Sequence, residues 1–316
     1  HALPEDRFVA IYTGPGIKPG ITEVGEPDQF YLNNGDGTFV HQPWLGGSFR
    51  DEDGQVLESI PRHWGLSVLF RDLNGDLLPD LLVCNDFAYG EDQIWMNQGG
   101  AVFHQLSNKA MRQSSWSSMA ADVADINRDG HDDLFIVEML SRQHAKRQTQ
   151  RANYETGIEA PAIAMGLDRP QTQRNTLFLN RGDGTYAEIG RMAGLDASEW
   201  SWGTVFLDVD LDGWEDVLVA NGNNHDLLDG DATIAAVIAM RSATRGQIPQ
   251  TLLMYPSLHT PNLAFRNRGD LTFEEISETW GFNEVGISQG ICLADLDRDG
   301  DLDVVVNNLQ GTPSLY

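Results

Sequence analysis

The residues of this chain with the clearest chemical potential are acidic side chains that recur at fixed spacing in four places. Each place has Asp at positions 1, 5 and 9 of a nine-residue stretch, with Asp or Asn at position 3. In chain order they are Asp72, Asn74, Asp76 and Asp80; Asp125, Asn127, Asp129 and Asp133; Asp208, Asp210, Asp212 and Asp216; and Asp295, Asp297, Asp299 and Asp303. Carboxylate and amide oxygens are the ligands that Ca²⁺ prefers, at roughly six to eight per ion. We therefore predict about four calcium sites, with these side chains as ligands.

The residues that follow position 5 show which kind of calcium loop this is. Position 6 is Gly in three loops, as a tight turn favours, but the first loop has Leu77 there and Gly75 at position 4. An EF-hand needs Glu at position 12 and a helix afterwards. The four loops instead have apolar residues at position 12, namely Val83, Ile136, Val219 and Val306. We expect loops that lead into β-strands, with the first loop the least regular; a solvated acidic turn would explain one copy but not four in register.

A second repeated element precedes each loop and indicates the fold. It contains two aromatic residues eight positions apart around an Asn and a Gly turn, as in Tyr31/Phe39, Trp95/Phe103, Phe178/Tyr186 and Phe265/Phe273. The second aromatic residue lies 22 positions before the next loop in three copies and 33 positions before it in the first. Repeats of four short antiparallel strands are typical of propeller blades. In the second unit we expect strands at 81–84, 93–96, 102–106 and about 118–124.

The repeats define the expected architecture. We predict an all-β fold, a β-propeller of four-stranded antiparallel blades over residues 1–316, with repeat units at about 8–80, 81–133, 134–216 and 217–303 and a fifth starting at 304–316. Insertions at about 141–174 and 223–262 interrupt two units, and Thr233–Arg241 favours a short helix. We expect four full blades plus partial blades of a larger, about seven-bladed propeller.

Composition limits the possible partners. The formal net charge is −26, from 47 acidic and 21 basic residues, which argues against nucleic acid or an anionic membrane as partner. The chain contains no 18-residue apolar stretch, so we predict no direct membrane insertion. Cys84 and Cys292 both lie in apolar runs, which favours two buried thiols over a disulfide.

The Asp loops, the Trp-Gly strands at His63-Trp64-Gly65 and Trp202-Gly203, and the Asn-x-Gly-Asp-Gly-Thr-Phe hairpin together resemble the FG-GAP/VCBS repeat. The chain is most similar to the group of the cartilage acidic proteins and of bacterial proteins ending in an ASPIC/UnbV domain, in their repeat region only. The resemblance implies a propeller like that of integrin α-subunits, with calcium held by the Asp and Asn side chains given above. It also implies an exported protein, found at the cell surface, in the periplasm or outside the cell.

These observations favour a calcium-binding module for adhesion, or for recognition of a glycan or protein ligand, in which calcium is structural. We assign no catalytic and no cofactor-binding residues, because the histidines do not cluster. One alternative is a lyase-like polysaccharide-processing enzyme with its site in the propeller funnel. Another is a structural subunit of a larger surface complex.

Overall fold

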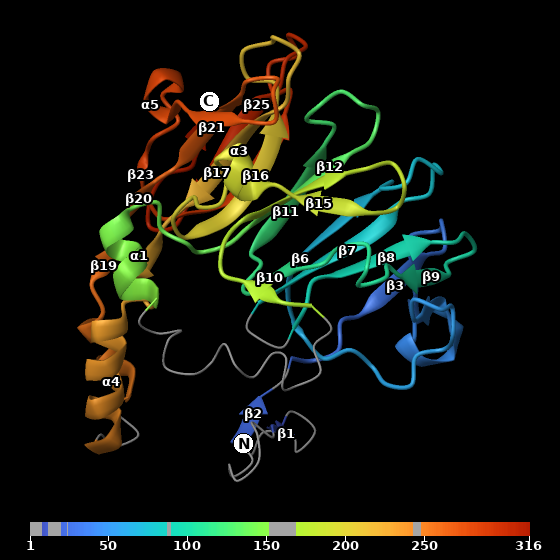
Figure 1. Cartoon of the computed structure of the whole chain (residues 1–316), viewed down its shortest axis with the longest axis horizontal. Helices are drawn as coiled ribbons and strands as arrows, with labels where there is room; N and C mark the ends of the chain where they lie inside the picture. Colours follow the sequence, from blue (N-terminus) through green and yellow to red (C-terminus); the bar gives the residue numbers. More distant parts are fainter. Residues whose placement is uncertain (1–7, 12–19, 24, 87–89, 152–168, 243–247) are drawn as a thin grey trace.

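Four β-sheets follow one another along the chain and fan out side by side (Figure 1). The computed structural model describes residues 8–11, 20–23, 25–86, 90–151, 169–242 and 248–316. The first strand of each sheet lies next to the first strand of the following sheet, as propeller blades require. The predicted all-β propeller of antiparallel blades is confirmed.

Each sheet begins with the strand that precedes an Asp loop, and the loop connects this strand to its antiparallel neighbour. The first sheet has β6 (Trp64–Arg71), β7 (Asp80–Asp86), β8 (Gln93–Asn97) and β9 (Phe103–Gln105), with β5 (Phe49–Arg50) added in parallel at its edge. The second has β11 (Ala120–Ala124), β12 (Asp133–Val137), β14 (Thr176–Asn180) and β15 (Tyr186–Glu188). The third has β16 (Ser201–Leu207), β17 (Asp216–Asn221), β21 (Leu263–Asn267) and β22 (Phe273–Glu275), and the fourth β24 (Ser288–Ala294), β25 (Asp303–Asn308) and β26 (Ser314–Leu315).

The sheets correct one expectation about how the strands group. A strand does form within 118–124, but it is β11, which pairs with β12 and heads the second sheet. The grouping of this strand with 81–106 is therefore wrong. The reason is that nine residues make a hairpin loop, and a hairpin joins neighbouring strands of the same sheet. The loops thus lie inside blades, between the first and second strands, rather than between blades.

Smaller elements surround the blades. Short strand pairs are β1 (Phe8–Ile11) with β2 (Gly20–Glu23), β3 (Phe30–Asn33) with β4 (Phe39–Gln42), β10 (Ser114–Ser115) with β13 (Gln171–Thr172), β18 (Asn223–His225) with β19 (Ser257–Leu258), and β20 (Thr260–Pro261) with β23 (Val285–Gly286). Helical segments are η2 (Trp44–Ser48), α1 (His144–Arg151), α3 (Gly190–Ala193), α4 (Gly230–Ser242), η3 (Ile248–Met254) and α5 (Ser277–Trp280). None of the helices in the described part of the chain is long and apolar enough to cross a membrane.

Both predicted insertions leave their blades at the same end. They follow β12 and β17, so they start at the end of the second strand, away from the Asp loop that begins it. Figure 1 shows α1 and α4, one from each insertion, outside the fan of sheets. Helix α4 confirms the helix expected over Thr233–Arg241. Residues 152–168 of the first insertion lie outside the described residues.

The hydrophobic core lies between consecutive sheets. Phe135 of the second sheet and Phe206 of the third pack with ring centroids 6.2 Å apart. They belong to one cluster of buried aliphatic and aromatic side chains. Trp95 is fully buried in the first sheet, as its place in the repeat predicts. Both cysteines are free, as predicted, and Cys84 is buried. Cys292 is exposed, which corrects the prediction of two buried thiols, because its side of the fourth sheet faces no further sheet among the described residues.

A repeated polar contact closes each complete blade at the end opposite the Asp loop. A backbone N–H near the end of the second strand donates to the side chain of a residue just before the third strand. The pairs are Asn85 with Asp92 (3.0 Å), Glu138 with Asn175 (2.8 Å) and Asn221 with Asn262 (2.9 Å). The first blade thus has a carboxylate where the other two have an amide.

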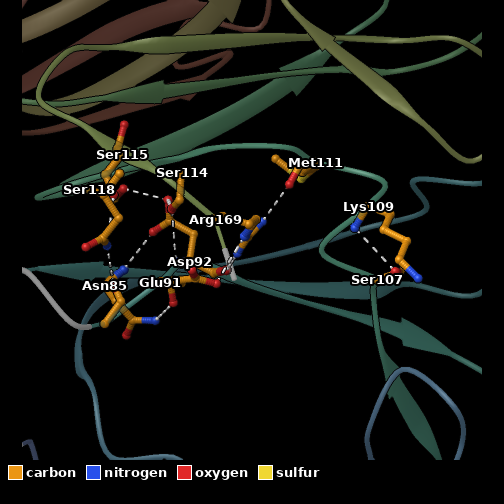
Figure 2. Close-up of polar contacts among 12 residues, drawn as sticks. Asn85, Glu91, Asp92, Ser107, Lys109, Met111, Ser114, Ser115, Ser118 and Arg169 are labelled. Carbon is orange, nitrogen blue, oxygen red and sulfur yellow. Dashed lines mark hydrogen bonds and ion pairs between the residues drawn. The ribbon is translucent and has the colours of Figure 1, made fainter. Parts of the chain in front are cut away.

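The Asp92 side chain lies in a buried polar network, shown in Figure 2. Its Oδ2 accepts hydrogen bonds from Ser114 Oγ (3.0 Å) and Ser118 Oγ (2.7 Å). Arg169 approaches from the first insertion and donates to the Asp92 carbonyl (2.9 Å) and to Glu91 Oε2 (3.0 Å). Burial raises the pKa of Asp92 to about 6 although these donors oppose the rise.

We predict that Asp92→Asn removes a pH dependence from folding. The folded chain holds the Asp92 proton up to about pH 6, and an unfolded chain holds an Asp proton only to about pH 4. The unfolding free energy of the parent therefore falls as pH rises through this interval. Relative to the parent, the variant should gain about 1 to 3 kcal/mol between pH 4 and 6.5 in urea unfolding with calcium present. Asp53→Asn, which removes an exposed carboxylate, is the matched control, and an equal gain at every pH would contradict the prediction.

Candidate metal centres

The four Asp loops share one backbone conformation. Positions 4 and 6 have positive φ in every loop, with pairs Gly75 and Leu77, Arg128 and Gly130, Leu211 and Gly213, and Arg298 and Gly300. Leu77 adopts φ +67° where the other loops have Gly, a conformation that costs a residue with a Cβ about 1 kcal/mol or more. The first loop therefore keeps the common shape despite its irregular sequence.

The curled backbone is held by the carboxylate at position 1. Asp125 accepts the N–H groups of Asp129 (3.0 Å) and Gly130 (2.8 Å), and Asp208 accepts the equivalent two groups at 3.0 and 2.7 Å. Position 5 accepts the N–H of position 7 in each loop, as in Asp129 with His131 (3.0 Å). These bonds turn the side chains of positions 1, 3 and 5 toward one side of the loop.

The carboxylate at position 9 is buried in the first three loops and connects three parts of its blade. One oxygen accepts the N–H of position 2, as in Asp133 with Ile126 (3.2 Å) and Asp216 with Val209 (3.0 Å). The other accepts the N–H of the Asn that ends the third strand, at 2.7 Å from Asn180 and 2.8 Å from Asn267. Position 9 is thus a structural hydrogen-bond acceptor as well as a predicted ligand, and the sequence pattern alone did not indicate the first role.

The same Asn residues link neighbouring blades. The amide of Asn180 donates to the carbonyl of Leu73 in the first loop (3.2 Å), and the amide of Asn267 donates to Ile126 in the second loop (3.0 Å). The first and second loops are therefore each held by their own blade and by the next one. The repeated aromatic-x-Asn signal had marked these residues as part of the repeat but not as links between loops.

Three predicted ligands come together in each of the last two loops. Asp208, Asp210 and Asp216 each place an oxygen within 4.8 Å of the others, and so do Asp295, Asp297 and Asp303. In the first two loops position 3 is Asn, whose amide nitrogen donates to position 5, at 3.0 Å for Asn74 and 2.9 Å for Asn127. All these donors are oxygen atoms or can present one, so the side chains fit a hard cation such as Ca²⁺.

The electrostatics of the loops favour a cation. Burial, assisted by the charges of Asp129 and Asp125, raises the pKa of Asp133 to about 7, and burial with Asp210 and Asp212 raises that of Asp216 to about 6. The hydrogen bonds that these carboxylates accept oppose the rise. The like charges of a loop thus disfavour the ionised state, and a divalent cation between them would reverse this effect.

An acidic groove of about 1370 Å³ runs along the loop end of the blades. Its ionisable lining includes Asp122, Asp125, Asp132, Asp208, Glu215, Asp299, Asp301 and Asp303 together with Arg71 and Tyr316. The alternative prediction of a lyase-like enzyme would need several His, Tyr, Lys or Arg side chains to converge, and it stays a prediction.

Comparison with known proteins identifies the class. A family model described as FG-GAP-like repeat matches residues 72–136, 163–219 and 250–306, which together are more than half of the chain. The chain therefore belongs to the FG-GAP-like repeat family. Each match ends in the second strand of one of the last three blades and contains the Asp loop before that strand. The resemblance inferred from the Asp loops and aromatic hairpins is confirmed.

Two curated relatives fit the group named from the sequence. The chain is 40% identical over 57 residues to cartilage acidic protein 1 of Xenopus tropicalis and of Homo sapiens. This match covers 18% of the chain and 9% of each relative, so it spans less than a tenth of their length. A solved structure, described as the basis of specific recognition of non-reducing terminal N-acetylglucosamine by an Agrocybe aegerita lectin, is similar over 95% of this chain and 60% of its own, with 14% identity and a TM-score of 0.41.

The two roles of the loop carboxylates predict two kinds of mutant. Asp133→Ala should lower the unfolding free energy by about 2 to 5 kcal/mol even in a chelator, because it leaves two buried N–H groups unpaired. Asp297→Ala removes an exposed side chain, so it should cost less than about 0.5 kcal/mol in the chelator and more in calcium. Urea unfolding with and without calcium measures both; an Asp297→Ala chain that is as stable as the parent in calcium would count against the fourth site.

Proposed function

We propose that the chain is a calcium-stabilised recognition module of an exported protein, in which calcium is structural and a protein ligand contacts the insertions. The observation that carries the calcium part is the repetition of one backbone conformation in four loops, with three carboxylates close together in the last two. Sites repeated around a scaffold and tied into the strands suit a structural ion better than a reactive one. Millimolar extracellular calcium would fill sites of ordinary module affinity.

Helix α4 supports the proposal of a protein ligand, because it buries a small apolar side chain and exposes large ones to solvent. Ala236 is fully buried, whereas Ile234 and Ile238 are 54% and 61% exposed. Asp229 fixes the start of the helix by accepting the N–H of Ala232 (2.8 Å). A surface helix normally buries its large apolar side chains and exposes its small or polar ones.

The exposed side chains of η3 extend this surface. Leu252, Leu253 and Met254 are all exposed, and η3 packs beside α4. An aliphatic surface of this kind suits a protein ligand, because sugar recognition relies on aromatic faces and hydrogen-bonding groups. Adjacent helix α1 contributes Lys146 and Arg147 from the main concentration of basic residues in this acidic chain.

Calcium removal is expected to destabilise the chain. A ligand that binds only the folded state adds about 2.7 kcal/mol per site when its free concentration is about 100 times its Kd. Thermal unfolding should therefore occur at a clearly lower temperature in a chelator than in millimolar calcium. Magnesium at the same concentration should restore less of the stability, because its smaller, strictly octahedral shell fits these loops poorly. Equal melting temperatures in calcium and chelator would contradict the calcium part.

The ligand surface predicts the effect of Ile238→Lys. This change places a charge on an exposed apolar side chain, so the melting temperature should stay within about 1 °C of the parent. Capture of extracellular proteins from cells that make the chain should fall at least about tenfold, as expected for a contact at the centre of an interface. Met192→Lys, at an exposed apolar residue outside the insertions, is the matched control and should bind normally. Equal capture by both variants, or binding only to a glycan array, would contradict a protein ligand at α4.

A further inference from the structure

The third Asp loop differs from the first two in having an arginine side chain against its predicted ligands. Arg266 lies in β21, one residue before Asn267, which ties the blade to the second loop. Its Nε is 2.7 Å from Asp210 Oδ2, and its Nη2 donates to Asp212 Oδ2 at 2.9 Å. These two carboxylates are positions 3 and 5 of the loop. We propose that the Arg266 side chain competes with calcium for these carboxylates, so that the third loop binds calcium most weakly of the four loops. The proposal rests on the calcium part of the proposed function.

The competition follows from which oxygens are available. Asp212 Oδ1 accepts the N–H of Trp214 (3.0 Å), as position 5 does in every loop, so Oδ2 is the oxygen left for an ion. Arg266 occupies that oxygen and one oxygen of Asp210. A calcium ion needs its ligand oxygens at about 2.3–2.6 Å. A guanidinium and a divalent cation compete for the same two oxygens, because their positive charges repel each other.

The repeat itself supplies the comparison. The residue before the linking Asn is Met96 in the first blade and Leu179 in the second, both uncharged. A second arginine, Arg128 of the second loop, also lies near the third loop. Its guanidinium is 4.4 Å from the centre of the Trp214 ring and donates a long hydrogen bond to the Asp212 carbonyl (3.5 Å). Two arginines therefore approach the third loop, and of the described arginines only Arg266 contacts its ligand carboxylates.

The third loop also has its own spectroscopic probe. Trp214 occupies position 7, whereas the other loops have Leu78, His131 and Asp301 there. Terbium replaces calcium at oxygen sites, and its luminescence is excited through a nearby indole. Trp280 lines a groove that residues of the third and fourth loops also line, so the signal assigned to the third loop is the part that Trp214→Leu abolishes. Competition with calcium then gives the calcium affinity of this loop in the full chain.

The decisive variant is Arg266→Met, which places the residue of the first blade at this position. Exposed ion pairs contribute modestly, so losing two should tighten terbium and calcium binding at the third loop roughly three- to thirtyfold. Arg268→Met is the matched control: Arg268 pairs with Glu274 (2.7 Å) and touches no ligand, so affinity should change by less than about twofold. The melting temperature of Arg266→Met should be lower than that of the parent in chelator, and calcium should raise it by more than it raises that of the parent. An arginine with a purely structural role would give the first effect without the second.

The outcomes separate this inference from the proposed function. If the parent shows no calcium-dependent stability and no terbium signal in any loop, the proposed function fails, and the inference fails with it. If calcium stabilises the parent but Arg266→Met binds at the third loop as Arg268→Met does, the inference alone is overturned. A third loop that takes up terbium only after Arg266→Met supports it, and a third loop that takes up none in either chain overturns it.

Discussion

The buried carboxylate at position 9 of the Asp loops is the constraint on which both the fold and the candidate sites depend. Asp133 accepts one N–H from its own loop and one from the third strand of its blade, and Asp216 does the same. The amides of Asn180 and Asn267 then donate to backbone carbonyls in the first and second loops, each in the preceding blade. Loop shape, strand register and blade spacing are thus set by one cluster of bonds. A cation at the loop would act on all three at once and would therefore be part of the scaffold.

This arrangement also explains how the chain can hold so much negative charge in small volumes. A buried carboxylate is tolerated only when it is protonated, well supplied with donors or neutralised by a cation. The backbone donors at Asp133 do not prevent a raised pKa, because burial, assisted by two other carboxylates of the same loop, outweighs them. The third loop is partly neutralised by Arg266, whereas the first two have the uncharged Asn74 and Asn127 at position 3, whose amides donate to the carboxylate at position 5. Neighbouring repeats thus reach the same shape with different amounts of residual charge.

The sequence predicted the loops and the strands after them because both are local patterns, read within about twelve residues. It also predicted the aromatic hairpins and the helix of the second insertion for the same reason. The grouping of strand β11 was predicted wrongly, although it too is local: a nine-residue hairpin loop joins neighbouring strands of one sheet. The exposure of Cys292 and the contact of Arg266 with Asp210 depend on residues far apart in the chain. Only their packing in three dimensions reveals them.

The two ends of the blades have different physical characters, and this difference separates stability from recognition. At the loop end, carboxylates line a groove, so this end suits cations rather than an acidic macromolecule. At the other end, amide and carboxylate acceptors such as Asn175 close the second strands and leave the chain free to extend into insertions. There α4 buries Ala236 and exposes Ile238. In water that orientation is unfavourable by the hydrophobic effect, so a surface that covers Ile238 would lower the free energy without any change in the blades.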